Sequence, residues 1–278
     1  MANIESKDIA VVVQGGIDPV NTPNCLLSIR RRFPKALIIL STWEGADVNG
    51  LDFDLLVKSK DPGGHTATIL RTGSKLPNNL ARQIVSTQAG LRYADRHYVL
   101  KTRSDLIWRD NAFLQYFGKY KNFNEDYRVF NERIIVTHVT HSYRTKQLFQ
   151  PMDWVAFGTQ GDMKRLYNIP IPKERENTVF FTGRELERKQ NLYFNSRYTS
   201  EQYIFIQCLR NASYYGFHDA TDVNDNLQQD CEKYLANCFI ILELGNQINF
   251  SFIKYKQYAH CPLYYSHNEW LALYKKYA

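Results

Sequence analysis

The chain has 278 residues, of which 44% are hydrophobic, 14% aromatic and 23% charged, and its formal net charge is +7. This composition is typical of a folded globular protein, and the length suits one large domain. No apolar run approaches the ~20 residues that a membrane-spanning helix requires. The polar, acidic N-terminus lacks the pattern of a signal peptide, so we expect a cytoplasmic protein.

The cysteines and the basic residues exclude further classes. No C-x-x-C pair occurs among the five cysteines, which argues against a disulfide framework and against a zinc site. The positive charge would suit a nucleic acid, an anionic membrane surface or a phosphorylated substrate. However, the sequence shows neither a recognition helix nor an aromatic-and-basic RNA-binding signature, so we expect no nucleic-acid partner.

The first hundred residues alternate between strand and helix patterns. The expected strands cover residues 8–15, 36–45, 53–64 and 97–105, and the expected helices cover residues 21–34 and 78–96. This alternation predicts an α/β fold with a mostly parallel sheet that helices flank on both faces. Ligands bind such sheets beyond the carboxyl ends of the strands, and candidate site residues are therefore sought there.

Beyond residue 110 the pattern is less regular. We expect strands over residues 133–139 and 153–159 and helices over residues 161–169 and 200–212. The polar, irregular segment 170–198 is a candidate lid. The tail is helical and aromatic in parts, and no repeat or linker interrupts the chain.

Three charged residues, Lys101, Arg103 and Asp105, end the fourth expected strand, just before a second apolar run. Burying an unpaired charge costs much free energy, so the charges of such a cluster are either paired with one another or functional. A carboxylate at this edge could hold a divalent metal against the diphosphate of a nucleotide donor. The usual Asp-x-Asp signature reads Arg103-Ser104-Asp105 here, and Arg103 could contact a phosphate instead. A purely structural ion pair is an equally good interpretation.

The first expected strand ends in the turn Gln14-Gly15-Gly16, at the position where α/β folds hold a base and ribose. This turn is not a G-x-G-x-x-G motif, which argues against a dehydrogenase. A G-x-x-x-x-G-K-[ST] motif is also absent, which excludes P-loop kinases and NTPases.

Several acidic and aromatic residues are further candidates. Glu201 begins an expected helix and could deprotonate an acceptor hydroxyl, although a carboxylate there also suits the helix dipole. Asp153 and Trp154 could form a sugar platform, or equally a capping acid beside a packed indole. The histidines are explained more simply as surface or packed residues: His138, His141 and His218.

The ordered segments DIAVVVQG, TPNCLLSIRRRFPKALIILSTWEG, LVKSKDPG, NNLARQIVSTQAGL and YVLKTRSDL together resemble the WavE lipopolysaccharide-synthesis family. The resemblance is clear up to residue 110 and looser through DWVAFG and SEQY. It implies a bacterial surface-polysaccharide glycosyltransferase of the GT-A type with a single domain over residues 1–278. That domain would comprise a nucleotide-binding half (1–110), an acceptor half (111–220) and a C-terminal helical and aromatic extension (221–278).

The same resemblance suggests a site. The residues expected to bind the nucleotide are Gln14, Gly15, Gly16, Ser41, Trp43 and Glu44. Those expected around the donor diphosphate and sugar are Gln83, Lys101, Arg103 and Asp105. Asp105 would hold Mn²⁺ or Mg²⁺. Independently of the resemblance, the position of Glu201 suggests that Glu201, or else Asp153, would activate the acceptor hydroxyl if the enzyme inverts.

We therefore expect a glycosyltransferase that moves a sugar from a nucleotide-sugar donor to a lipopolysaccharide or capsular polysaccharide acceptor, which would be lipid-linked or a free oligosaccharide. Peripheral contact with an anionic inner membrane would use the basic surface and the end WLALYKKYA. Two alternatives stay open. A nucleotidyltransferase would usually carry a glycine-rich basic loop after the first strand, and VVQGGIDPVNT contains no lysine or arginine. In a non-catalytic polysaccharide-assembly protein, the three charges would simply pair.

Overall fold

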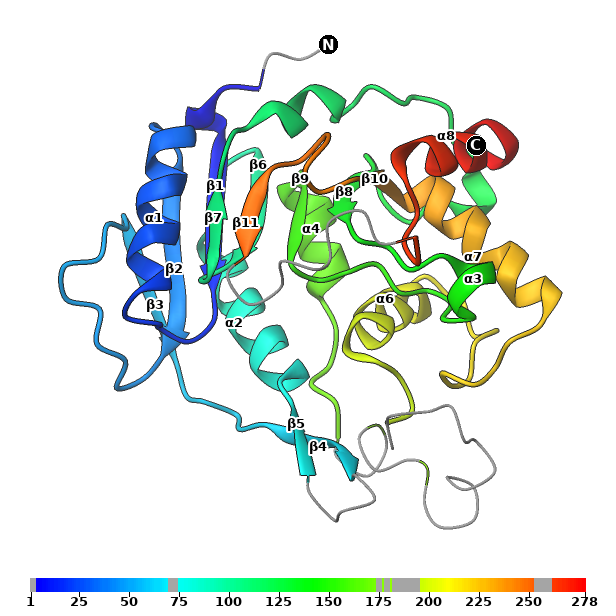
Figure 1. Cartoon of the computed structure of the whole chain (residues 1–278), viewed down its shortest axis with the longest axis horizontal. Helices are drawn as coiled ribbons and strands as arrows, with labels where there is room; N and C mark the ends of the chain where they lie inside the picture. Colours follow the sequence, from blue (N-terminus) through cyan, green and yellow to red (C-terminus); the bar gives the residue numbers. More distant parts are fainter. Residues whose placement is uncertain (1–3, 70–74, 174–176, 178–180, 182–195, 253–261) are drawn as a thin grey trace.

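A seven-stranded sheet forms the centre of the structure, a computed structural model that describes residues 4–69, 75–173, 177, 181, 196–252 and 262–278. The strand order is β10-β8-β9-β6-β1-β2-β3 (Figure 1). The strands are β1 (Ile9–Gln14), β2 (Leu37–Trp43), β3 (Leu55–Ser59), β6 (Tyr98–Arg103), β8 (Ile134–Thr137), β9 (Val155–Thr159) and β10 (Phe239–Leu242).

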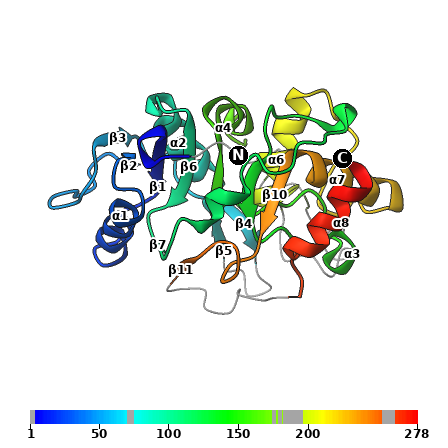
Figure 2. The ribbon, with the colours of Figure 1, turned by 90° about the horizontal axis from the view of Figure 1, so that it is seen from above.

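Helices cover both faces of this sheet (Figure 2). The helices of one face are α2 (Leu80–Tyr93), α4 (Gln160–Tyr167) and α6 (Ser200–Asn211). The opposite face carries α1 (Asn21–Arg32) and α8 (His267–Tyr277). The other helices are α3 (Ser142–Thr145), α7 (Asp225–Cys238) and the short 3-10 helices η1 (Ser6–Asp8), η2 (Ala112–Tyr116) and η3 (Glu125–Tyr127). The expected α/β architecture with a mostly parallel, helix-flanked sheet is thus confirmed.

The direction of β9 decides which loops meet at the site. Strand β1 is parallel to β2 and β6, and β8 is parallel to β10, whereas β9 is antiparallel to both β6 and β8. The start of β9 therefore lies at the same sheet edge as the carboxyl ends of its neighbours. As a result, the loop that contains Asp153 and Trp154 reaches the edge where Arg103 ends β6.

The packing of α2 on the sheet is unusually close. All six residues of β1 are buried, as expected for a strand covered on both faces. A Cβ added at Gly90 of α2 would come within 2.4 Å of Val12 Cγ1 in β1, so the two elements can approach only because residue 90 is glycine. One turn before Gly90, Ser86 Oγ donates to Gln14 Oε1 (2.7 Å), which joins α2 to the carboxyl end of β1.

The strand expected over residues 97–105 is β6, which ends at Arg103, and a turn at Ser104 and Asp105 joins it to a second strand. Beyond the turn, β7 (Leu106–Trp108) leaves the main sheet and pairs antiparallel with β11 (Phe250–Phe252). A short hairpin of β4 (His65–Ile69) and β5 (Lys75–Asn78) was not expected at all. The turn matters because it places Asp105 at a bend rather than inside a strand.

The C-terminal part of the chain is integrated into the fold, because it supplies β10 to the central sheet. Trp270 and Leu273 of α8 are buried, whereas Lys275 and Lys276 are exposed. No helix among the described residues is long and apolar enough to cross a membrane. The four described cysteines are free and buried, and most of the candidate lid over 170–198 lies outside the described residues.

Candidate functional site

A cavity of about 490 Å³ opens at the carboxyl ends of β1 and β6. The turn after β1 forms one wall. Gly15 has a φ of +126°, and a Cβ there would lie 3.1 Å from Ser104 Oγ, so only glycine fits without strain. Ser104 Oγ donates to the Gly16 carbonyl (2.7 Å) and Ser104 N to the Gln14 carbonyl (3.1 Å), which ties the turns after β1 and β6 together.

The expected nucleotide-binding residues are distributed unevenly around this cavity. Its lining includes Gln14, Gly15, Gly16 and Trp43. Ser41 is fully buried beneath α2 and donates to the Ser86 carbonyl (2.7 Å). Its own carbonyl accepts from Gly15 N (3.1 Å), so Ser41 supports the turn from below. Glu44 is exposed and does not line the cavity.

Two ion pairs dominate the charge of the cavity. Arg103 donates to both oxygens of Asp105 (2.9 and 2.8 Å), and Arg82 donates to both oxygens of Asp61 (2.8 Å each). The structural pair that the sequence left open as an alternative is thus the observed arrangement. The lining also contains more carboxylates than guanidinium groups. Its carboxylates belong to Asp18, Asp61, Asp105 and Asp153, and its guanidinium groups belong to Arg82 and Arg103. A bound diphosphate would therefore require an opened ion pair or an added cation.

Lys101 lies beneath the site. Its side chain is fully buried, and its Nζ donates to the backbone carbonyl of Asp153. Burial lowers the pKa of Lys101 to about 8, and the nearby charge of Asp153 opposes that shift. This lysine therefore holds the loop before β9 in place, whereas the sequence placed it around the donor diphosphate.

A second cavity, of about 320 Å³, adjoins the first one. Both are lined by Asn79, Gln83, Arg103 and Asp153, so the two cavities lie side by side and share these residues. Glu201 and Trp154 line only the second cavity. The structure thus brings together residues that are far apart in the sequence and that the sequence had marked as candidates: Gln83, Arg103, Asp153 and Glu201.

Glu201 is held at the first turn of α6. Thr199 caps the helix through a capping box with Gln202, which fixes where the helix begins. Burial, followed by the negative charge of Asp153, raises the pKa of Glu201 to about 7. A carboxyl group with such a pKa can accept and return a proton near neutral pH.

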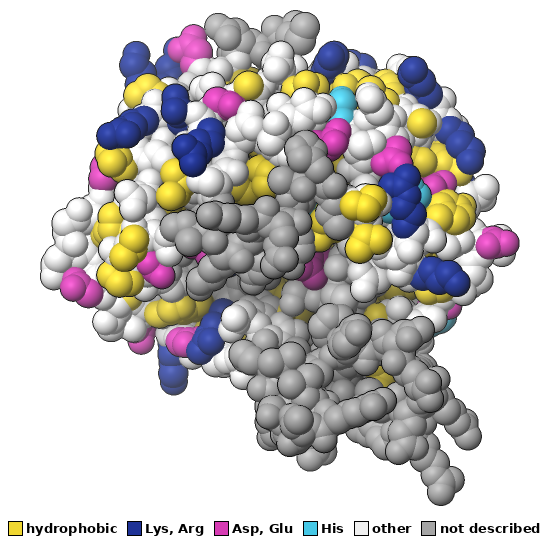
Figure 3. Space-filling view, in the orientation of Figure 1, with side chains coloured by type: hydrophobic (Ala, Val, Ile, Leu, Met, Phe, Trp, Pro, Cys, Tyr) yellow, Lys and Arg dark blue, Asp and Glu magenta, His cyan; other side chains and the backbone are white. Residues whose placement is uncertain are grey.

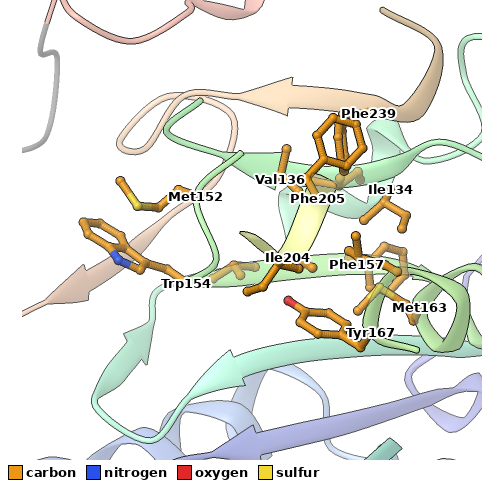
Figure 4. Close-up of a cluster of buried hydrophobic side chains, with 14 of the residues drawn as sticks. Ile134, Val136, Met152, Trp154, Phe157, Met163, Tyr167, Ile204, Phe205 and Phe239 are labelled. Atoms are coloured by element: carbon orange, nitrogen blue, oxygen red, sulfur yellow. The ribbon is translucent and has the colours of Figure 1, made fainter. Parts of the chain in front are cut away.

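Trp154 is anchored by the hydrophobic core. Figure 4 shows Trp154 and Met152 at the margin of a buried cluster that includes Phe157, Ile204 and Phe205. Since Ile204 and Phe205 belong to α6, the same cluster packs the helix that carries Glu201 against the strand that begins after Trp154. The core therefore sets the distance between the indole and Glu201.

Several lining residues were missed by sequence reasoning. Asp61 follows the third parallel strand, and that position was a usable signal for the same sheet edge. Arg82 and Asn79 lie at the start of α2, which the sequence placed correctly without assigning them a role. Tyr264 lines the second cavity, but it comes from a distant part of the chain with no motif around it.

The residues present fit a divalent metal only in part. Within the described ranges, no group of three or more His, Cys, Asp and Glu side chains could hold a metal ion. Asp105 is a single carboxylate that already pairs with Arg103. Mg²⁺ in enzymes is often held by one or two carboxylates together with substrate phosphates, so Asp105 fits this role when a diphosphate supplies the other ligands.

Comparison with known proteins gives one family. The model described as WavE lipopolysaccharide synthesis matches residues 9–278. No curated protein matches the chain at a significant level. Because the family match spans nearly the whole chain, the protein belongs to the WavE family, whose role is in lipopolysaccharide synthesis.

Proposed function

We propose that the protein is a glycosyltransferase of the GT-A type. It moves a sugar from a nucleotide-sugar donor to a lipopolysaccharide or capsular polysaccharide acceptor. One observation carries this proposal: the cavity at the ends of β1 and β6 adjoins the cavity that Glu201 lines, and both are lined by Gln83, Arg103 and Asp153. A nucleotide site of the kind that parallel sheets form is thereby adjacent to a carboxyl group suited to proton transfer.

The donor occupies the larger cavity. Trp43 and the turn after Gln14 take the nucleoside, and Arg103 meets the diphosphate. When Arg103 turns to a phosphate, Asp105 loses its partner and becomes available to Mn²⁺ or Mg²⁺. The metal would supply positive charge for the departing nucleoside diphosphate.

Glu201 acts on the acceptor. The acceptor hydroxyl oxygen attacks the anomeric carbon of the donor while the bond from that carbon to the diphosphate oxygen breaks. The hydroxyl proton passes to Glu201, and the electron pair of the broken bond leaves with the diphosphate. Burial, followed by the charge of Asp153, keeps the pKa of Glu201 high enough for this task, and Lys101 keeps the Asp153 loop in place.

A non-catalytic role in polysaccharide assembly is the second candidate. The observation in its favour is that both arginines of the larger cavity are already paired with aspartates. Such a protein would bind polysaccharide without consuming a nucleotide sugar.

Any contact with a membrane surface would use basic side chains. The apolar residues Trp270 and Leu273 of α8 are buried in this fold and cannot insert into lipid without disrupting the core. Lys275 and Lys276 are exposed and could meet anionic headgroups beside a lipid-linked acceptor.

The test is consumption of nucleotide sugars by the purified chain, with Mn²⁺ and a truncated lipopolysaccharide acceptor. Candidate donors carry UDP, GDP, dTDP or CMP. The wild type should consume one donor class, and Glu201→Gln should reduce the rate by roughly 100-fold or more, since general bases contribute that much. Glu125→Gln, a change at an exposed carboxylate of η3, is the matched control. No consumption of any donor, or full activity of Glu201→Gln, would contradict the proposal.

A further inference from the structure

A third cavity, of about 230 Å³, lies at the carboxyl ends of β8 and β10. Its lining includes Thr137, the last residue of β8, and Leu242, the last residue of β10. These ends belong to the same sheet edge as the ends of β1 and β6, because β9 between them runs in the opposite direction. The three cavities therefore follow one another along this edge.

An aromatic wall connects the third cavity to the Glu201 cavity. Tyr264 lines both of them. The ring of His138 lies between Trp154 and Tyr264, with centroids 5.0 Å from each. His138 adopts a φ of +55°, which is uncommon for a residue other than glycine and places this buried ring in the wall.

Polar groups complete the third cavity. Glu243 Oε2 accepts from His267 N (3.2 Å), while Glu243 Oε1 has no hydrogen-bond partner among the described residues. Arg144 donates to the Pro262 carbonyl (2.8 Å) and contacts Glu269, and its side chain is 44% exposed. In Figure 3, side chains of both charges gather beside hydrophobic ones over α3 and α8.

This chemistry suits one kind of ligand. Aromatic faces pack against the apolar faces of sugar rings, and carboxylates accept while guanidinium groups donate hydrogen bonds, which matches neighbouring hydroxyls. The lining contains two carboxylates, Glu243 and Glu269, and one arginine. This excess of negative charge disfavours the binding of a phosphate group. The mixture of charges equally disfavours a purely apolar ligand.

We propose that the third cavity is a subsite for the saccharide acceptor, in which Glu243 and Arg144 bind hydroxyls of an inner sugar. The terminal sugar then lies along Trp154 and Tyr264, with its reacting hydroxyl beside Glu201. The inference rests on the proposed function, because that function assigns the reacting hydroxyl to Glu201. Acceptor specificity is accordingly set at the ends of β8 and β10, away from the donor site.

The test measures saccharide binding directly, without any reaction. The probe is the core oligosaccharide released by mild acid from the lipopolysaccharide of a host strain that lacks this protein. Its affinity is measured by calorimetry for the wild type, Glu243→Gln and Arg144→Ala. The first change keeps the shape of the side chain, so it tests the subsite even if Arg144→Ala perturbs folding. Controls of the same type are Glu125→Gln and Arg109→Ala, both at exposed sites outside the three cavities.

The wild type should bind the oligosaccharide, and each subsite change should weaken binding about tenfold, as the loss of a hydrogen bond to a charged group predicts. Both control variants should bind like the wild type, and affinity for nucleoside diphosphates should not change. Equal oligosaccharide affinity in all variants, or no binding by the wild type, would overturn the subsite. If binding depends on Glu243 but no nucleotide binds, the subsite stands and the transferase proposal fails.

Discussion

At pH 8, replacing Glu201 with glutamine should raise the free energy of unfolding above that of the wild type. At pH 5 this gain should be much smaller. Burial and the charge of Asp153 raise the pKa of Glu201 from 4.5 to about 7 in the folded protein. Between these two values the folded state binds more protons than the unfolded state, so stability falls as the pH rises through this range. Glutamine carries no charge and avoids that loss.

The size of the effect follows from the pKa difference. At about 1.36 kcal/mol per pKa unit, the shift of Glu201 corresponds to an upper limit of about 3 kcal/mol. Glu201 lines a cavity that solvent can enter, so we expect about 1–2 kcal/mol. For a chain of this length, each kcal/mol changes Tm by about 2 °C.

The assay is thermal and urea unfolding of the wild type, Glu201→Gln and Glu125→Gln at pH 5, 6, 7 and 8 and constant ionic strength. The stability difference between Glu201→Gln and the wild type should grow with pH up to about pH 7 and then level off. Glu125→Gln is the matched control, because that side chain is exposed. A difference for Glu201→Gln that stays constant across the pH series would refute the reasoning.

Three further changes test separate parts of the structure. Asp105→Asn should abolish the effect of Mn²⁺ on nucleotide binding measured by calorimetry; an undiminished effect would mean that another group holds the metal. Arg103→Lys should weaken nucleoside diphosphate binding about tenfold in the same assay, because lysine cannot form the bidentate contact; unchanged affinity would remove Arg103 from the phosphate site. Gly90→Ala should lower the free energy of unfolding by about 1–3 kcal/mol in urea titrations, because its Cβ would overlap Val12; a negligible change would show that α2 can shift.

The architecture was accessible from the sequence because β1, β2 and β6 are buried on both faces and alternate with helices. Apolar runs such as residues 9–13 leave little choice of structure. The direction of β9 was not accessible, since the side-chain pattern of a strand is the same for either direction. That direction is what brings Asp153 to the edge beside Arg103.

The candidate site was predictable where position along a strand was sufficient. Gln14 and Arg103 end adjacent parallel strands, and both line the cavity. Position did not reveal orientation, so Ser41 was expected in the cavity although it lies under α2. Lys101 was likewise expected around the donor diphosphate, and its burial depends on packing that no local pattern encodes. Tyr264 meets the site only through the tertiary fold.

The most direct test of the central claim is the unfolding of the wild-type chain in the presence of UDP, GDP, dTDP, CDP or CMP, each with and without Mn²⁺. One nucleotide at about 100 times its dissociation constant should stabilise the folded state by about 2.7 kcal/mol, and Mn²⁺ should strengthen that effect. If no nucleotide stabilises the protein under either condition, the cavity at the ends of β1 and β6 is not a donor site. The proposed glycosyltransferase activity would then be contradicted.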